Sequence, residues 1–125
     1  MSANDANEKI IYRDLSYKLT GLFFDVHNEI GRFEKEKKYA DAIEKKLLEK
    51  NIAHKREFCI DSLGNTVDFL IEEKLILEVK AKQLIVKNDF YQTQRYLQSS
   101  QMKLGLIVNF RNRYLKPIRI IRINR

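Results

Sequence analysis

The sequence predicts one domain of the α/β class, with a mixed α+β arrangement in which helices flank a mixed β-sheet. Two observations lead to this prediction. The chain has 125 residues, 44% of them apolar, which suits a single globular domain. Apolar residues recur at helical spacing up to Lys50 and alternate from His54 onward, with one further helical stretch between alternating segments.

Two helices are expected in the N-terminal part of the chain. Residues 1–14 are polar and aperiodic, which indicates a flexible arm ahead of a single domain spanning 15–125. A first helix is expected over 14–31, where Gly31 provides a C-cap, and a second from about Glu36 to Lys50. The apolar stripes of these helices are Leu15, Leu19, Leu22, Phe23, Val26 and Ile30 in the first, and Tyr39, Ala40, Ile43 and Leu47 in the second.

The remainder of the chain alternates between strand patterns and one more helix. Strands are expected over residues 54–61, 66–72, 75–81, 103–110 and 117–124, and a helix over 87–100. The first three strands follow one another closely and should form a meander. The helix between the third and fourth strands is a crossover, which favours parallel pairing of those two strands.

The excess positive charge is confined to the C-terminal segment. The net charge of +7 comes from 24 basic and 17 acidic residues, and residues 101–125 hold seven basic residues and no acid, which leaves 17 of each sign before them. The seven are Lys103, Arg111, Arg113, Lys116, Arg119, Arg122 and Arg125. This distribution predicts a surface that binds a polyanion, with a solvated basic tail as the alternative.

The composition also bears on the compartment and the assembly. One cysteine, Cys59, excludes an intramolecular disulfide and fits a reducing cytosol, so a cytoplasmic location is expected. The apolar runs are too short to cross a membrane, and the N-terminus lacks the basic-then-apolar order of a signal peptide. The core of such a chain is small, which is compatible with a homodimer.

Charged residues interrupt one face of each of two neighbouring strands. Because side chains alternate along a strand, Glu78 and Lys80 share a face in 75–81, while Asp68 lies on the corresponding face in 66–72. The opposite, purely apolar faces are formed by Leu75, Leu77, Val79 and Ala81 in one strand and by Val67, Phe69 and Ile71 in the other. A hairpin loop with an odd number of residues, such as 72–74, places Asp68 opposite Glu78.

Two opposed carboxylates need compensation. Like charges across a sheet repel, and a half-buried carboxylate in such a pair tends to keep its proton. A divalent cation compensates directly, since carboxylate oxygens suit Mg²⁺, and Lys80 can then reach a metal-bound water or a phosphate. The alternative is a plain ion pair between Asp68 and Lys80 with Glu78 at the rim.

Residues on two of the predicted helices are further candidates for the same site. Glu36 lies on the inward stripe of the second helix at its first turn, either as a third acid over the sheet or as a charge that favours the helix start. Gln92, Arg95 and Tyr96 share a face of the third helix by their spacing. They are candidates for orienting water and phosphate, or ordinary surface.

These residues resemble a known nuclease motif. Asp68 followed by Glu78-Val79-Lys80 resembles the PD-(D/E)XK signature, and further segments resemble its small GxxExxR family over roughly residues 18–122. The segments are "KLTGLFFDVHNEIG", "GRFEKEKKYADAIEKKL", "VDFLIEEKLILEVKA" and "QTQRYLQSSQMKLGLIVNF". The resemblance implies a restriction-endonuclease-like αβββαβ core with an extra N-terminal helix and a C-terminal strand.

The sequence departs from the family pattern at two points. Val67 replaces the usual proline, and Gly31-Arg32-Phe33 replaces a frequent Gly-Pro-Gly. The second departure leaves open whether Glu36 or Glu34 is the helix acid, and helical phase favours Glu36.

The resemblance also implies roles for individual residues. Asp68, Glu78 and the carbonyl of Val79 would bind Mg²⁺ or Mn²⁺, with Glu36 on the metal or its water. Lys80 would orient or activate the attacking water, and Gln92 would assist. We expect nucleic acid, with DNA favoured, to be held by Arg95, Arg111, Arg113 and Lys116.

Three further questions of interpretation stay open. His27 is either a catalytic base or, as favoured, a packing or capping residue. The whole chain is either a nuclease or a nucleic-acid-binding module that does not cut. If it cuts, a dimeric junction resolvase is one form that it could take.

Overall fold

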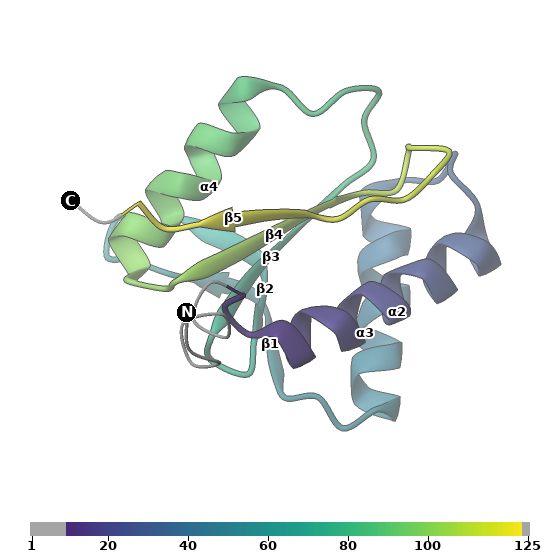
Figure 1. The fold of residues 1–125 in the computed structure, drawn as a ribbon, viewed down its shortest axis with the longest axis horizontal. Coiled ribbons are helices and arrows are strands. Elements are labelled where there is room, and N and C mark those ends of the chain that lie inside the picture. Colours follow the sequence, from purple (N-terminus) through teal and green to yellow (C-terminus); the bar gives the residue numbers. More distant parts are fainter. Residues whose placement is uncertain (1–9, 124–125) are drawn as a thin grey trace, which may run out of the picture.

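The structure confirms the α/β fold with a mixed sheet. It is a computed structural model that describes residues 10–123, and its elements are labelled in Figure 1. The elements are α2 (Arg13–Ile30), α3 (Glu36–Glu49), β1 (His54–Cys59), β2 (Thr66–Ile71), β3 (Leu75–Lys80), α4 (Lys87–Ser100), β4 (Leu104–Asn109) and β5 (Ile118–Ile121).

The sheet has the strand order β1-β2-β3-β4-β5. The β1–β2, β2–β3 and β4–β5 pairs are antiparallel, whereas β3 and β4 are parallel. This confirms the predicted meander and the predicted parallel pair across the α4 crossover, because a helical connection returns the chain to the start of the next strand.

Helix α2 begins earlier than expected. It starts at Arg13, so the last two residues of the predicted arm are helical, while residues 1–9 of that arm lie outside the described residues. The helix start is held to the sheet by Arg119 of β5, which donates hydrogen bonds to the carbonyl of Ile11 (2.7 Å) and to the hydroxyl of Ser16. A contact between segments far apart in the sequence therefore stabilises the start of this helix.

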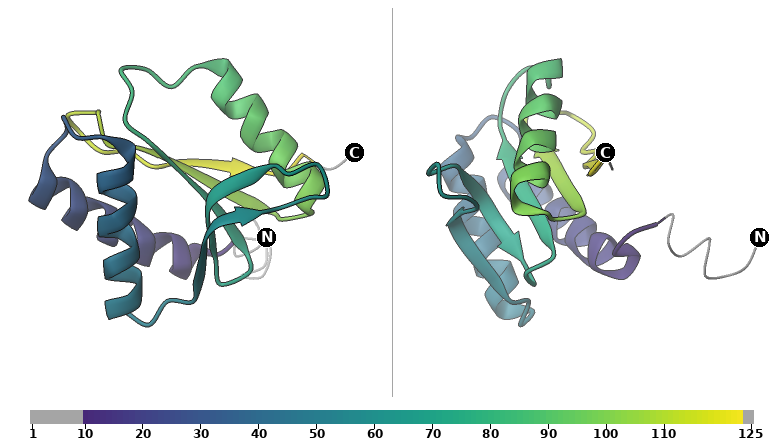
Figure 2. Two further views of the ribbon diagram at one scale, coloured as in Figure 1. Left: turned by 180° about the vertical axis from the view of Figure 1, so that it is seen from behind. Right: turned by 90° about the vertical axis from the view of Figure 1, so that its left-hand side faces the viewer.

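The sheet is buried between two apolar layers. Helices α2 and α3 cover one face and α4 covers the other, as the views in Figures 1 and 2 show. The larger layer joins Phe23, Tyr39 and Ile43 of the helices to Leu77 and Val108 of the strands. The smaller layer is formed by Val67, Ile76, Leu97, Ile107 and Ile120. Among the described helices, none is long and apolar enough to span a bilayer.

One expectation about the faces of β2 is wrong. Val67 was expected on the same face as Phe69 and Ile71, but it packs in the layer under α4 while the other two pack under α2 and α3. The β1–β2 pairing skips Glu57 and Asp68, and Glu57 has a left-handed backbone with φ of 50°. Val67 and Phe69 are two residues apart yet face opposite layers, so the alternation of side chains breaks at Asp68.

Helix α4 approaches β4 closely at Gly105. A Cβ atom built on Gly105 would lie 2.8 Å from Cγ2 of Thr93 and 3.8 Å from Cδ1 of Leu97. Thr93 is 2% exposed, and its hydroxyl donates to the carbonyl of Asp89 (3.0 Å). The glycine therefore sets how near the helix can come to the sheet.

We expect Gly105→Ala to lower the free energy of unfolding by about 1–3 kcal/mol, because the added methyl overpacks this contact. Thr93→Ser removes Cγ2 and keeps the hydroxyl, so the double variant should recover part of the loss. Urea denaturation of the two single variants and the double variant gives the coupling energy. Strictly additive effects would contradict a direct contact between the two positions.

Candidate active site

The carboxylates of Asp68 and Glu78 meet where β2 and β3 stop pairing. The observed pairs, Phe69 with Leu77, Leu70 with Ile76 and Ile71 with Leu75, confirm the predicted odd loop and register. The next pair in this register would be Asp68 with Glu78.

At that position, side chains replace the ladder hydrogen bonds. The amide of Val79 donates to Oδ2 of Asp68 (2.7 Å), and the amide of Asp68 donates to Oε1 of Glu78 (3.2 Å). Each carboxylate is thus fixed by the backbone of the other strand. The strands separate here without leaving these two amides unpaired.

The two carboxylates differ in burial and in their titration. Glu78 is 8% exposed, and its burial together with the nearby charge of Asp68 raises its pKa to about 7. Asp68 is half-buried, and burial raises its pKa as well, against the opposing effects of the Val79 amide and Lys80. Ionisation of both carboxylates is therefore unfavourable unless a cation is bound beside them.

Lys80 ends β3 beside this pair. Its positive charge acts to lower the pKa of both Asp68 and Glu78, although it does not outweigh burial. Within residues 10–123, the structure records no hydrogen bond or ion pair of the Lys80 side chain. The alternative of an Asp68–Lys80 ion pair with Glu78 at the rim is therefore wrong, since Glu78 is buried.

Glu36 reaches the site from the first turn of α3. It lines a cavity of about 260 Å³ together with Arg56, Glu57, Asp68 and Val79. Its charge further raises the pKa of Glu78, after the larger effects of burial and Asp68. Glu34 instead forms an ion pair with Lys38 (3.4 Å), and it is not among the residues that line this cavity.

The three acids do not form one compact cluster. Among the described residues, no group of three or more His, Cys, Asp or Glu side chains is placed to hold a metal ion. Asp68 and Glu78 are joined through backbone amides, while Glu36 is exposed at the cavity wall. A metal site would therefore depend on two carboxylates, a backbone carbonyl and water, which is a common set for Mg²⁺.

Helix α4 brings Gln92 and Tyr96 to the other side of Glu78. Burial and then the charge of Glu78 raise the pKa of Tyr96, and Nε2 of Gln92 donates to the Tyr96 hydroxyl (2.8 Å). No hydrogen bond joins Gln92 itself to either carboxylate in the part of the chain that the structure describes. Arg95 is exposed and lines a separate hollow with Tyr91 and Ser99.

A hydrogen-bonded clamp beside the site was not expected from the sequence. The Lys82 ammonium bonds the carboxylate of Asp89 (2.8 Å), and buried Asn109 bonds both the amide (3.1 Å) and the carbonyl (2.7 Å) of Lys82. The Asp89 carboxylate also accepts from the amide of Val86 (2.8 Å) at the start of α4. An acid three residues after a helix start is the signal that could have revealed Asp89.

Basic residues of the β4–β5 connection, 110–117, lie at the same end of the sheet as Lys80. Strand β4 is parallel to β3, Asn109 pairs with Lys80, and the amide of Phe110 donates to the carbonyl of Lys80 (2.9 Å). Arg111 is half-buried, whereas Arg113 and Lys116 are exposed. This placement puts all three of these predicted nucleic-acid contacts in the connection that leaves the site.

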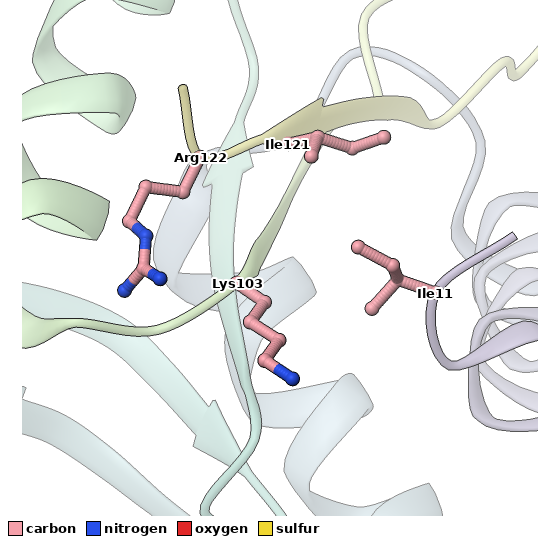
Figure 3. Close-up of a pocket in the computed structure, with 4 residues that line it drawn as sticks. All are labelled: Ile11, Lys103, Ile121 and Arg122. Atoms are coloured by element: carbon pink, nitrogen blue, oxygen red, sulfur yellow. The ribbon is translucent and has the colours of Figure 1, made fainter. Parts of the chain in front are cut away.

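The expected single basic surface is divided among different places. Lys103 precedes β4 and lies with Arg122, Ile11 and Ile121 around a hollow (Figure 3), at the opposite end of a six-residue strand, or about 20 Å from the site end. Arg119 holds the start of α2, and its burial lowers its pKa. Arg125 lies outside the described residues.

His27 has the packing role that was favoured for it. Its Nε2 donates to the carbonyl of Asn112 (2.9 Å), and its ring is tilted against Phe110. It ties α2 to the β4–β5 connection.

A comparison with protein families gave one match. A family model described as "PD-(D/E)XK nuclease superfamily" matches residues 13–123. The comparisons with curated proteins and with solved structures gave no match.

We expect the pKa of Glu78 to produce a pH-dependent loss of stability. The folded state binds the Glu78 proton more tightly than the unfolded chain, so the free energy of unfolding in EDTA should fall as pH rises from about 4.5 to about 7. A shift of this size corresponds to about 3 kcal/mol. Glu78→Gln should remove this part of the pH dependence.

The measurement is urea denaturation across this pH range, with Glu72→Gln, an exposed acid of the β2–β3 turn, as the matched control. Mg²⁺ added near neutral pH should raise the melting temperature of the wild type more than that of Glu78→Gln. Parallel pH curves for wild type and Glu78→Gln would show that the buried carboxyl is not the cause.

Two arginines of the C-terminal segment should differ in how much their removal lowers the free energy of unfolding. Arg119→Ala should cost about 1.5–3 kcal/mol, since it removes charge-assisted hydrogen bonds to Ile11 and Ser16. Exposed Arg113→Ala should stay within about 0.5 kcal/mol of wild type. Thermal and chemical denaturation test this prediction. Equal effects of the two substitutions would refute the distinction between a structural Arg119 and a surface Arg113.

Proposed function

The chain belongs to the PD-(D/E)XK nuclease superfamily, and we propose that it is a divalent-metal-dependent nuclease that hydrolyses phosphodiester bonds, with DNA as the favoured substrate. One observation carries the proposal. The buried carboxylate of Glu78 lies beside Asp68 with a raised pKa, next to Lys80. A divalent cation supplies the positive charge that these two carboxylates lack.

The residues present fit a divalent cation. Asp68, Glu78 and the carbonyl of Val79 would hold Mg²⁺ or Mn²⁺, because hard oxygen ligands suit these ions and the pair lacks compensating charge. When bound, such an ion lowers the pKa of its water and offsets negative charge on the phosphoryl oxygens. Glu36, at the wall of the same cavity, is proposed to hold an outer water.

Lys80 is proposed to act on the reacting groups. Its ammonium lies close enough to influence both carboxylates, and it can orient the attacking water and stabilise the charge that develops on the phosphoryl oxygens. The water oxygen bonds to phosphorus while the bond to the leaving sugar oxygen breaks. The attacking water gives up one proton and the leaving oxygen takes up one, so one water is consumed for each bond that is cut.

Gln92 is proposed as a positioning residue. It donates to the hydroxyl of Tyr96, whose pKa is raised by burial and by Glu78, so Tyr96 stays protonated beside the site. Gln92 would thus act on the site through Tyr96, whose hydroxyl it holds. Arg111, Arg113 and Lys116, in the connection after β4, are proposed to contact substrate phosphates.

We expect Lys80→Ala to lower Mg²⁺-dependent cleavage of DNA by about 10²- to 10³-fold, because a stabilising charge is lost at the reacting phosphate. Asp68→Asn should have a similar effect. Lys45→Ala, an exposed lysine of α3, is the matched control and should cut as wild type does.

Cleavage of labelled linear, branched and single-stranded DNA, and of RNA, with Mg²⁺ or Mn²⁺ tests this proposal. Circular dichroism checks that each variant is folded. Cleavage by Lys80→Ala at the wild-type rate would refute the assigned role. Binding without cleavage of any of these substrates would favour the non-cutting module instead.

A further inference from the structure

Two aromatic side chains stand exposed in the connections beside the site. Phe33, between α2 and α3, is 73% exposed, and Tyr114, between β4 and β5, is 78% exposed. Large apolar side chains gain nothing from packing in such positions. Single exposed aromatic residues are common on protein surfaces, so exposure alone does not mark a binding site.

Both rings are accompanied by guanidinium groups. The guanidinium carbons of Arg32 and Arg111 lie 4.9 Å and 5.1 Å from the centre of the Phe33 ring, and that of Arg113 lies 5.3 Å from the centre of the Tyr114 ring. Arg111 and Phe33 come from different connections, so their contact depends on the fold. We call Phe33, Tyr114 and these three arginines the aromatic–arginine rim.

The backbone beneath this rim is held in place. Nε of Arg32 donates to the carbonyl of Arg111 (2.9 Å), and the Tyr39 hydroxyl donates to the carbonyl of Gly31 (2.6 Å). The Tyr39 ring stacks on Phe110, with centres 4.4 Å apart. Figure 1 shows the two connections side by side at one end of the molecule. The loops are thus ordered by groups other than the exposed rings.

The exposure of Tyr114 also contrasts with that of its neighbour. Leu115 is 6% exposed and packs into the larger apolar layer, so this connection contains a buried anchor and an exposed ring in succession. The connection holds no acid over residues 110–117. A positively charged, aromatic surface is the result.

The rim adjoins the proposed cleavage site. Phe110, which stacks on Tyr39, donates its amide to the carbonyl of Lys80 (2.9 Å), and Arg111 follows directly. A nucleic acid strand whose phosphate lies at Lys80 would continue over these two connections. Charge complementarity then favours a polyanion as the occupant over an apolar protein partner.

We propose that the aromatic–arginine rim binds unpaired nucleotides, so that the substrate of the proposed nuclease is a single strand or a duplex with a single-stranded segment. This inference rests on the proposed function. Unpaired bases stack on exposed aromatic rings and on guanidinium planes, whereas the bases of an intact duplex are already stacked on each other. The arginines contact the phosphates of the same strand.

The test separates bases from phosphates. Fluorescence anisotropy in EDTA, which prevents hydrolysis, compares an oligothymidylate of about 20 nucleotides with an abasic strand of the same length. Wild type should bind the oligothymidylate about a hundredfold more tightly, since each of the two stacked bases contributes about tenfold. Phe33→Leu and Tyr114→Leu should each lose about tenfold for the oligothymidylate and little for the abasic strand.

Three control variants sharpen this comparison. Tyr17→Leu replaces a tyrosine of α2 that is 81% exposed, and should bind as wild type does. Phe33→Trp should retain the preference for bases, because it keeps a ring. Arg113→Gln should weaken both probes equally and reduce the slope of binding against salt by about one.

Equal binding of the two probes by wild type would overturn the inference, and so would Phe33→Leu and Tyr114→Leu proteins that melt normally and bind normally. Failure of the rim and failure of the nuclease are distinguishable. Cleavage that depends on Lys80 but shows no preference for bases would support the proposed nuclease and refute the proposed role of the rim. Binding that depends on bases, without metal-dependent cleavage, would support the proposed role of the rim and refute the proposed nuclease.

Discussion

The site depends on the exchange of backbone pairing for side-chain pairing between β2 and β3. The Val79 amide donates to Asp68, and the Asp68 amide donates to Glu78, where a regular ladder would use carbonyl oxygens. This exchange lets the strands part while their amides stay bonded. It also holds two carboxylates together at one end of two inner strands, where burial disfavours the ionisation of both.

The surrounding elements converge on that opening because β3 and β4 are parallel. Parallel strands end on the same side of a sheet, so the connection after β4 begins beside Lys80. Tyr39 of α3 then joins this connection to the one after α2, through its stack on Phe110 and its bond to Gly31. One buried tyrosine thus orders the loops that carry the exposed rings and arginines.

Prediction from the sequence succeeded where the signal was local and periodic. The register of Asp68 with Glu78 followed from the turn length, and the crossover followed from the helix between two strands. It failed for Val67, because the alternation of side chains in β2 breaks at Asp68, where the pairing with β1 is also interrupted. It also grouped Arg119 with the solvent-exposed cations, although Arg119 bonds to Ile11, which is 108 positions away.

The sequence by itself determined the elements, their order, and the presence of Asp68, Glu78 and Lys80 at neighbouring strand positions, since periodicity and spacing are properties of the chain. Only the tertiary structure decided which charges are buried and which groups share a surface. It divided the basic segment between the two ends of β4 and the start of α2, and it brought Arg111 to Phe33. Burial and proximity arise from packing between distant segments, and no local pattern encodes them.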